Sequence, residues 1–474
     1  MQRRKPLSGA LTGPGRAPSA LILARLDRLP GTRHVWTLIA LLSLGGVFEF
    51  YDLFMTGYVV PGMVQAGLLA HVGIALFDGP ALFVAATFAG LFIGTFAFGF
   101  VADRFGRRSI FTWSLLWYSV AAFIMAFQHR GEAVCLWRLI AGIGIGVELV
   151  TIDTYIAELT PKHLRGRAFA FNQVVQFAAV PLVAFISYLL VPLAPMGFEG
   201  WRWVVAIGAL GALVVWFIRR SLPESPRWLI NQGRLAEADA VTTAIETRVR
   251  ADLRGAALPE PAAHAVERPE VLGSFTEVWR APYRGRTLML MVFQFFQSFG
   301  YYGFAAWVPT LIARQVGINL GASLLYAFII AVANPFGPLL AMSFADRWER
   351  KWQMVGAACG VAIFGVLFSF QATLGLLTLC GVLITLSNNV LSCAFHSYQT
   401  ELFPTRIRAR AVGFTYSFSR LSTVFASFII GFFLQQAGTR GVFGVIAFAM
   451  LMVVLSVGIF GPATRALELE EISH

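Results

Sequence analysis

The sequence contains few charged residues. Asp, Glu, Lys and Arg make up 13% of its 474 residues, whereas soluble proteins contain about 25%. Hydrophobic residues make up 57% of the chain, and 43 residues are phenylalanine. The shortage of charge together with so many apolar side chains predicts a protein whose main solvent is the lipid bilayer rather than water.

Cysteine is also scarce. The chain has four cysteines, which lie singly inside apolar stretches: Cys135, Cys359, Cys380 and Cys393. They form neither the paired, loop-borne set of a disulfide framework nor the clustered Cys/His spacing of a metal site. The sequence also lacks a glycine-rich Lys-Ser/Thr loop for binding nucleotide phosphates. We therefore expect no bound metal, no cofactor and no use of ATP.

Apolar runs long enough to cross a bilayer, about 20 residues each, occur twelve times. They lie at 36–63, 81–102, 108–127, 133–159, 168–191, 201–218, 287–313, 322–345, 352–371, 373–398, 411–436 and 441–462. This pattern predicts an all-α membrane protein of two six-helix bundles. The expected domains are a basic tail at 1–33, bundles at 34–218 and 286–462, a cytoplasmic linker with short helices at 219–285, and a tail at 463–474. The first tail is rich in Pro and Gly and lacks the apolar core of a signal peptide, so we expect it to be mobile.

Lys and Arg are distributed unevenly between the two sides of these spans. If the amino terminus is inside, that side receives the basic tail, loop residues such as Arg104, Arg107 and Arg108, and the arginine-rich linker. The opposite side receives only Arg130, Arg202, Arg314 and Arg440. This positive-inside pattern predicts that both termini are cytoplasmic. It also explains the net charge of +12 without a nucleic-acid partner.

The two halves of the chain contain an internal repeat. Asp103-Arg104 with Arg107-Arg108 returns 243 positions later as Asp346-Arg347 with Arg350-Lys351. A second pattern returns at the same offset: Tyr155, Glu158, Pro161 and Arg165 reappear as Tyr398, Glu401, Pro404 and Arg408. Two six-helix halves related by a repeat are typical of secondary transporters, whose solute site lies between the halves.

Four motifs of the first half occur in a characteristic order. They are Gly99-Phe-Val-Ala-Asp103-Arg104-Phe-Gly106-Arg107-Arg108, Arg138-Leu-Ile-Ala-Gly142-Ile-Gly144-Ile-Gly146, Tyr155-Ile-Ala-Glu158-Leu-Thr-Pro161-Lys-His-Leu-Arg165-Gly166 and Pro223-Glu-Ser-Pro-Arg227-Trp-Leu229. In this order they resemble the major facilitator superfamily, in particular its sugar-porter and organic-ion-transporter branch. The resemblance implies that the halves rock around a central site and that the linker braces them. Sugar porters carry Gln-Leu-Ser on helix 7, where this chain has Gln294-Phe-Phe-Gln297, and this difference disfavours a hexose.

Acids and arginines at the cytoplasmic helix ends form the gate that the resemblance implies. They are Asp103, Arg104, Arg107, Glu158, Arg165, Asp346, Arg347, Glu401 and Arg408. Ion pairs among them would close the cytoplasmic side when the site faces out and would break when it faces in. The alternative is that these residues only set the topology and cap helices.

Several charged residues are predicted inside the hydrocarbon, where an unpaired charge is costly; Glu148 and Asp153 follow Arg138 on the fourth span. Glu49 and Asp52 share a helix face, and Arg138 lies on the fourth span. Proton-coupled sugar porters resemble this chain in pairing an acid at the Asp52 position with an arginine at the Arg138 position. Burial favours the neutral acid and a neighbouring cation favours the carboxylate, so breaking the pair would let Asp52 take up a proton. A permanent pair that fixes helix packing is the alternative.

Arg420 is predicted in the middle of the eleventh span, with no acid near it in sequence. Its spacing from Pro404 matches the position at which organic-anion transporters carry an arginine, and an arginine suits a carboxylate through a two-point contact. The alternative is a structural partner for Glu49. Further candidates for substrate binding are Gln294, Gln297, Phe299, Tyr301, Tyr302, Asn388, Asn389 and His396. For the aromatic residues and the histidine, packing is the alternative.

These features together predict a proton-coupled importer of a small organic acid. Phe48-Glu-Phe-Tyr-Asp52 and Glu148-Leu-Val-Thr-Ile-Asp-Thr-Tyr155 are similar to stretches of bacterial niacin transporters, which implies nicotinate as substrate and the bacterial inner membrane as location. We expect a monomer that is not an enzyme. The alternatives are a uniporter, a symporter of sugars or other metabolites, an organic-ion exporter, and a membrane sensor that binds a ligand without moving it.

Overall fold

The computed structural model describes residues 16–70, 72, 78–98, 101–219, 222–254, 256–261, 275–344, 347–403 and 405–464. These residues form helices and turns and include no strand. The helices before the linker are α1 (Arg16–Asp27), α2 (Arg33–Gln65), α3 (Gly79–Phe98), α4 (Val101–Phe105), α5 (Arg107–Ala126), α6 (Gly131–Leu159), α7 (Arg165–Leu190) and α8 (Gly200–Arg219). The linker contributes α9 (Pro226–Asn231) and α10 (Leu235–Asp252). The remaining helices are α11 (Tyr283–Ala305), α12 (Val308–Val316), α13 (Leu320–Ala331), α14 (Phe336–Phe344), α15 (Arg350–Phe370), α16 (Leu374–Glu401) and α17 (Thr405–Phe460).

Several of these helices could cross a membrane. Within the described residues, nine segments are long and apolar enough to do so. The last of them lies in α17, which includes both predicted runs 411–436 and 441–462 and changes direction at Gly438, where φ is 61°. A positive φ is readily available only to glycine. The predicted run 201–218 coincides with α8, and 287–313 is divided between α11 and α12.

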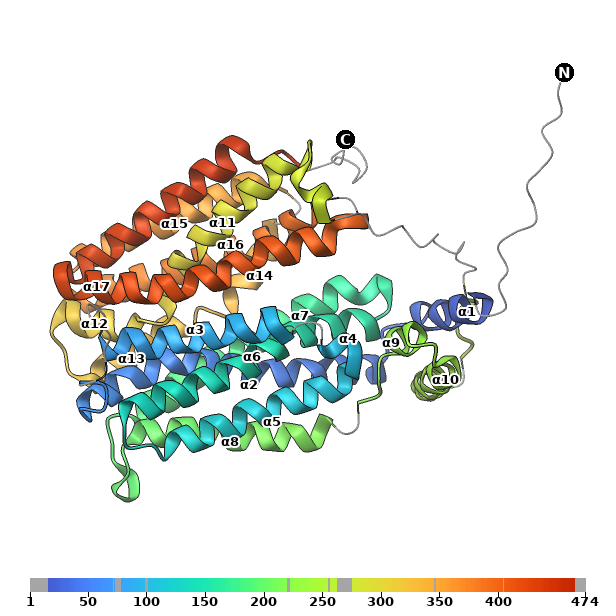
Figure 1. Cartoon of the computed structure of the whole chain (residues 1–474), viewed down its shortest axis with the longest axis horizontal. Helices are drawn as coiled ribbons and strands as arrows, with labels where there is room; N and C mark the ends of the chain where they lie inside the picture. Colours follow the sequence, from blue (N-terminus) through green and yellow to red (C-terminus); the bar gives the residue numbers. More distant parts are fainter. Residues whose placement is uncertain are drawn as a thin grey trace.

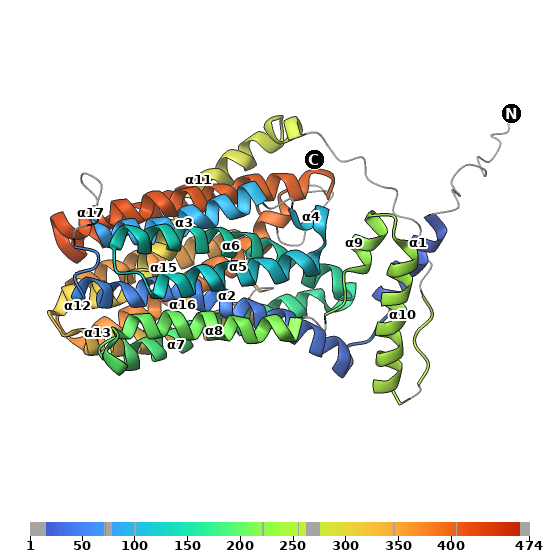
Figure 2. The same ribbon diagram turned by 60° about the horizontal axis from the view of Figure 1, so that its bottom comes forward.

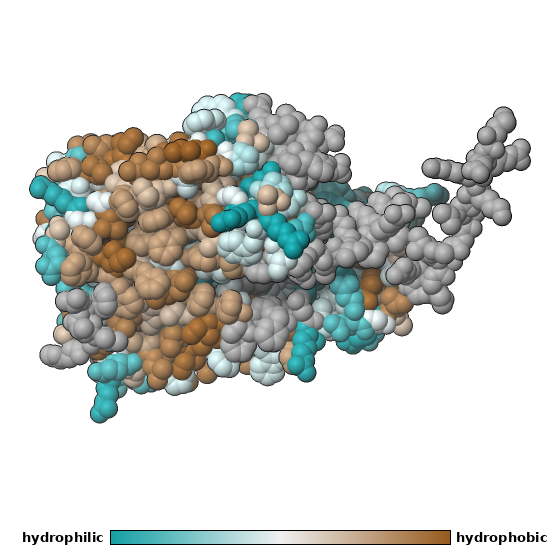
Figure 3. Space-filling model, turned by 45° about the horizontal axis from the view of Figure 1, so that its top comes forward, coloured by the Kyte–Doolittle hydropathy of each residue, from teal (hydrophilic) through white to brown (hydrophobic). Residues whose placement is uncertain are grey.

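The long helices lie side by side in two groups. Figure 1 shows α2 to α8 in one group and α11 to α17 in the other, with α1, α9 and α10 beyond one end of the helices. Figure 2 shows from another direction that α1, α9 and α10 lie beyond the end of the long helices. We call the two ends of the molecule the α10 end and the α12 end. The space-filling view in Figure 3 shows an apolar surface over the bundle, with polar residues towards its ends, as expected for contact with lipid.

The internal repeat of the sequence is also seen in the ion pairs of the two halves. In the first half, Arg107 Nη2 lies 3.0 Å from Glu158 Oε1. In the second half, Arg350 Nη1 lies 2.9 Å from Glu401 Oε1, and both residues are 243 positions further along the chain. Each half is therefore fastened at its α10 end by the same ion pair.

The two halves meet closely at the α12 end. A methyl group placed on Gly57 of α2 would lie 2.6 Å from the carbonyl oxygen of Ala306 at the end of α11. Only glycine permits this approach of the two backbones. Nearby, Gln435 Nε2 of α17 donates to Asp78 Oδ2 before α3 at 2.6 Å. The α12 end is therefore closed by contacts between the halves.

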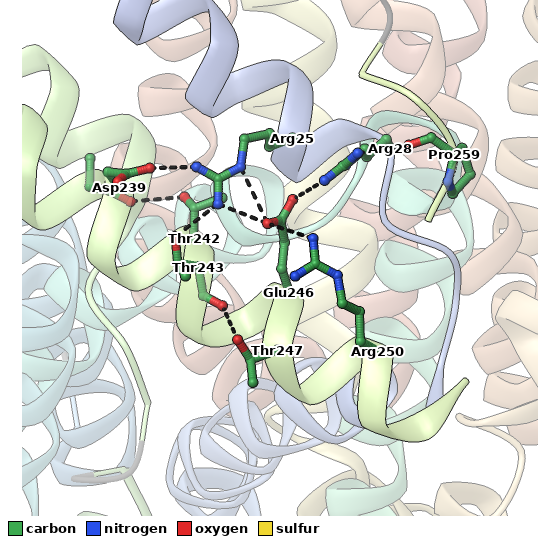
Figure 4. Close-up of polar contacts among 10 residues, drawn as sticks. Arg25, Arg28, Asp239, Thr242, Thr243, Glu246, Thr247, Arg250 and Pro259 are labelled. Atoms are coloured by element: carbon green, nitrogen blue, oxygen red, sulfur yellow. Dashed lines mark hydrogen bonds and ion pairs between the residues drawn. The ribbon is translucent and has the colours of Figure 1, made fainter. Parts of the chain in front are cut away.

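Helix α1 is held against α10, so residues 16–32 are not the mobile tail that we expected. Figure 4 shows Arg25 of α1 and Arg28, directly after α1, on either side of Glu246 of α10. The Glu246 carboxylate accepts from Arg25 Nη2 at 2.8 Å and from Arg28 Nη2 at 2.6 Å. Arg25 also pairs with Asp239. Burial by itself would raise the pKa of Glu246, but the hydrogen bonds and charges of the two arginines outweigh it and hold that pKa below its ordinary value.

Replacing Glu246 with glutamine should release α1 from α10. Hydrogen bonds to charged groups contribute about 1.5–3 kcal/mol each, so amide exchange in residues 16–29 should accelerate about tenfold or more. Because the pKa of Glu246 is lowered in the folded state, the stabilisation is present at neutral pH. It should be lost as the pH falls below about 4, through the folded-state value. Exchange measured by mass spectrometry at pH 7 and under acid conditions checks both effects.

The matched control is Glu237→Gln, which removes an exposed acid of α10 whose partner among the described residues is the exposed Arg234. Exposed pairs contribute little, so exchange in α1 should stay as in the parent. Equal exchange rates in α1 for both variants would show that Glu246 does not hold the helix.

Candidate functional site

A cavity lies between the two halves near the middle of the long helices, with an empty volume of about 760 Å³. Its walls come from α2, α6 and α7 of the first half and from α11, α16 and α17 of the second. The lining residues are Phe50, Leu53, Phe54, Leu149, Asp153, Gln173, Gln176, Phe177, Gln297, Tyr301, Tyr302, Ser392, Phe395, His396, Tyr416, Ser419 and Arg420.

Arg420 is the cation of this cavity. Its side chain is buried, with 2% exposure, and it donates to the hydroxyls of Tyr302 at 3.0 Å and Tyr416 at 2.9 Å. Its Nε has no hydrogen-bond partner among the described residues, and its guanidinium makes no ion pair within 4.0 Å with them. Glu49 lies within electrostatic range but not in direct contact. A buried charge of this kind needs an opposite charge, which an anionic ligand would supply.

Flat rings surround the guanidinium. Its carbon lies 5.0 Å from the ring centre of Tyr416 and 5.9 Å from that of Tyr302. Tyr302 meets Tyr301 edge to face at 4.9 Å. His396 completes the wall, held by its Nδ1 at 2.7 Å from the carbonyl oxygen of Ser392. Such rings can make stacked or edge-to-face contacts with a planar ligand, so the cavity offers a cation beside aromatic surfaces.

Four of the residues predicted for this site lie elsewhere. Gln294 is buried behind the wall, where it donates to Gln399 at 3.3 Å and accepts from Gln297 at 3.5 Å. Phe299 packs against Phe295 and Phe296, because it lies on the face of α11 opposite to Gln297 and Tyr301.

Asn388 and Asn389 line a second, smaller cavity of about 360 Å³ on the side towards α12. Asn388 Nδ2 donates to the carbonyl of Gly300, and Asn389 Nδ2 donates to the carbonyl of Asn334, both at 3.1 Å. The two cavities share Phe54 and Tyr301 as lining residues. The asparagines thus hold helices together beside the central cavity.

Asp52 and Arg138 form the ion pair that the sequence suggested. Arg138 Nη1 lies 2.7 Å from Asp52 Oδ2, and both side chains are buried. Arg138 also donates to the backbone oxygen of Asp52, to Thr56 Oγ1 and to Thr87 Oγ1, at 2.7–2.9 Å. Neither charged residue lines the central cavity, although Leu53 and Phe54 do. Glu49, one turn before Asp52, is fully buried as well.

The residues of the predicted gate lie at the α10 end, and the described ion pairs join residues of the same half. Glu158 pairs with Arg107, whereas the partner of Glu401 is Arg350 rather than Arg347. Arg104 and Arg347 are exposed, and Arg165 donates to the carbonyl of Thr160 at 3.4 Å. The remaining gate residues lie outside the described part of the chain, either as a whole or in their side chains: Asp103, Asp346 and Arg408.

Another pocket lies on the α10 side of the central cavity. It has an empty volume of about 560 Å³ and shares Gln173 with the cavity. On the side of the second half it is lined by Arg350 and Ser397, near the ends of α15 and α16. A pocket therefore adjoins the central cavity on its α10 side, whereas the halves are in contact at the α12 end.

Sequence reasoning missed several lining residues. Asp153 carried a signal, since it is an acid within an apolar helix, but no role was assigned to it. Gln173, Gln176 and Tyr416 are polar or aromatic residues on predicted spans, yet nothing in the sequence distinguishes the helix face that meets the other half.

The chain matches the sugar (and other) transporter family over residues 38–474. It belongs to this family. The resemblance to the major facilitator superfamily is thereby confirmed, and so is the prediction that the chain is not an enzyme, because the sugar-transporter family consists of membrane transporters.

Two relatives within the sugar-transporter family cover nearly the whole chain. YyaJ from Bacillus subtilis, named as a metabolite transport protein, is 32% identical over 450 residues, which is 93% of this chain and 95% of that protein. The niacin transporter NiaP from Acinetobacter baylyi is 27% identical over 452 residues, or 95% of this chain and 99% of that one.

Solved structures of the xylose transporter XylE from E. coli confirm the all-helical fold. The inward-open conformation of XylE matches with a TM-score of 0.72 and 21% identity, over 92% of this chain and 99% of that one. Another structure of XylE, described as a proton:xylose symporter, matches with a TM-score of 0.69. At this level of identity the similarity shows the fold alone.

Proposed function

We propose that the chain imports a small aromatic acid, with nicotinate as the candidate, by proton symport across the bacterial inner membrane. Arg420 carries this proposal, because it is a buried cation, makes no direct contact with a described carboxylate, and lines the cavity between the two halves. The tyrosines around it suit a planar ring. A sugar has no negative charge for Arg420 to neutralise, so the same observation disfavours a sugar symporter.

The proposed cycle is alternating access by a monomer with twelve spans and both termini in the cytoplasm. The α10 end is then cytoplasmic, and the structure corresponds to the state in which the site is reached from inside. In the opposite state the α12 contact at Gly57 and Ala306 separates and the α10 ends approach. The ion pairs Arg107–Glu158 and Arg350–Glu401 would then exchange partners across the cytoplasmic gate.

The proposed source of energy is the proton gradient, without a cofactor. Asp52 is the candidate proton carrier, because it is a buried acid in direct contact with Arg138. A rearrangement of α2 against α6 within the first half during the cycle would break that contact. The name of the A. baylyi relative supports niacin as substrate, and the description of XylE as a proton:xylose symporter supports proton coupling on this scaffold.

Uptake into liposomes tests the proposal. Purified protein is reconstituted with its outside acidified by one pH unit, and radiolabelled nicotinate is added. Symport with one proton should concentrate nicotinate about tenfold, since 1.4 kcal/mol corresponds to a factor of ten. Collapse of the gradient with a protonophore should return the internal concentration to that outside. Equilibration without accumulation would indicate a uniporter, and absence of any protein-dependent uptake would remove nicotinate as the substrate.

A further inference from the structure

Asp153 is the acid of the central cavity. It lies on α6 of the first half, and its side chain is exposed although it belongs to an apolar helix in the bundle. No hydrogen bond or ion pair joins its carboxylate to another residue in the described part of the chain. An acid placed inside a membrane protein faces water or a ligand rather than lipid.

Asp153 is separate from the proposed proton pair. Fifteen positions separate it from Arg138 on the same helix, which corresponds to about 22 Å along the helix axis. Arg138 and Asp52 are enclosed by their own hydrogen bonds, whereas the Asp153 carboxylate opens into the cavity. The two acids thus have different surroundings and different access to a solute.

Asp153 and Arg420 face the same cavity from opposite halves of the molecule. They do not pair, because no ion pair within 4.0 Å joins them. Opposite charges that share a cavity without touching leave room for a ligand between them, with its negative group towards α17 and its positive or hydrogen-bonding group towards α6. A ligand that contacts both residues also connects the two halves, which links recognition to closure.

We propose, building on the function above, that Asp153 determines specificity by binding a ring nitrogen of the aromatic acid whose carboxylate is bound by Arg420. The substrate class is then an amphoteric aromatic acid, such as a pyridine carboxylate. The bond between the Asp153 carboxyl and the nitrogen contains one proton, which lies on either atom. If it lies on the nitrogen, the carboxylate accepts; if it lies on the carboxyl, the ring nitrogen accepts.

Nicotinate and benzoate form a matched pair of probes, because benzoate has the same shape and carboxylate but a carbon in place of the ring nitrogen. Equilibrium binding of both is measured on the full chain in detergent at one fixed pH. The parent should bind nicotinate about tenfold or more tightly than benzoate, as expected for a hydrogen bond to a charged group. Asp153→Ala should lose that preference and bind nicotinate as it binds benzoate.

Benzoate affinity serves as the internal control for folding, because it should be the same in Asp153→Ala, in the parent and in Glu237→Gln, which removes a distant exposed acid. An equal loss of both ligands in an Asp153→Ala protein that unfolds at the same temperature as the parent would overturn the proposal, as would equal affinities of the parent for the two probes. Both of those results leave an aromatic-acid carrier intact. If the parent bound neither probe, the proposed function itself would fail.

Discussion

Replacing Arg420 with glutamine should abolish accumulation of nicotinate and lower its binding affinity by about a hundredfold or more. The guanidinium offers two parallel donors to a carboxylate, and each charge-assisted bond is worth about 1.5–3 kcal/mol. Glutamine keeps a single amide donor and removes the charge. Arg420→Lys should fall between the two, because an ammonium retains the charge but not the two-point geometry. Binding in detergent and uptake in liposomes measure both effects.

Arg440→Gln is the matched control, since Arg440 is an exposed cation on the same helix, α17, and lies away from the cavity. Its guanidinium carbon is 5.0 Å from the ring centre of Phe370. Uptake by this variant should equal that of the parent. Thermal unfolding separates a loss of binding from a loss of folding. Retention of nicotinate uptake in a stable Arg420→Gln protein would eliminate the carboxylate argument.

Replacing Asp52 with asparagine should uncouple transport from the proton gradient. The variant should no longer concentrate nicotinate, so the ratio of internal to external nicotinate at one pH unit should fall from about tenfold to one. Exchange of labelled for unlabelled nicotinate should continue. Asparagine still accepts from Arg138, and the bonds of that arginine to Thr56 and Thr87 remain, so the variant should fold. Uptake with a pH gradient checks the loss of accumulation. Counterflow without a gradient, measured on the same liposomes, checks that exchange continues.

Glu132→Gln provides the comparison, because Glu132 is an exposed acid in the first turn of α6. It should accumulate nicotinate as the parent does. If Asp52→Asn also accumulates normally, the buried pair only holds α2 against α6 and the proton travels by another group. If it loses exchange as well, Asp52 is required for movement of the halves rather than for coupling.

The fold was largely predictable, because lipid requires long apolar helices and because the halves repeat. The apolar runs predicted long helices in both halves, and the resemblance to sugar porters implied the Asp52–Arg138 pair, which the structure contains. The contact of α1 with α10 was not predicted. Arg25 and Glu246 are separated by 221 positions, and a helix of 12 residues is too short to be stable without packing.

The site was predictable by residue type more than by position. Gln297, Tyr301, Tyr302, His396 and Arg420 line the cavity as expected. Phe299 does not, because two residues along a helix are enough to turn a side chain to the other face. The sequence analysis did not include Arg350, the partner of Glu401, among the gate residues. The internal repeat could have indicated it, because Arg350 and Glu401 are the repeat equivalents of Arg107 and Glu158.

Helix α10 packs against α1, α2 and α9, and α1 and α2 belong to the first half. If the halves rock, α10 should therefore move together with the first half, and its distance to the second half should change. A pair of spin labels on α10 and on the start of α15 would then act as a ruler for the transport cycle. A pair on α10 and α2 would give the fixed reference length.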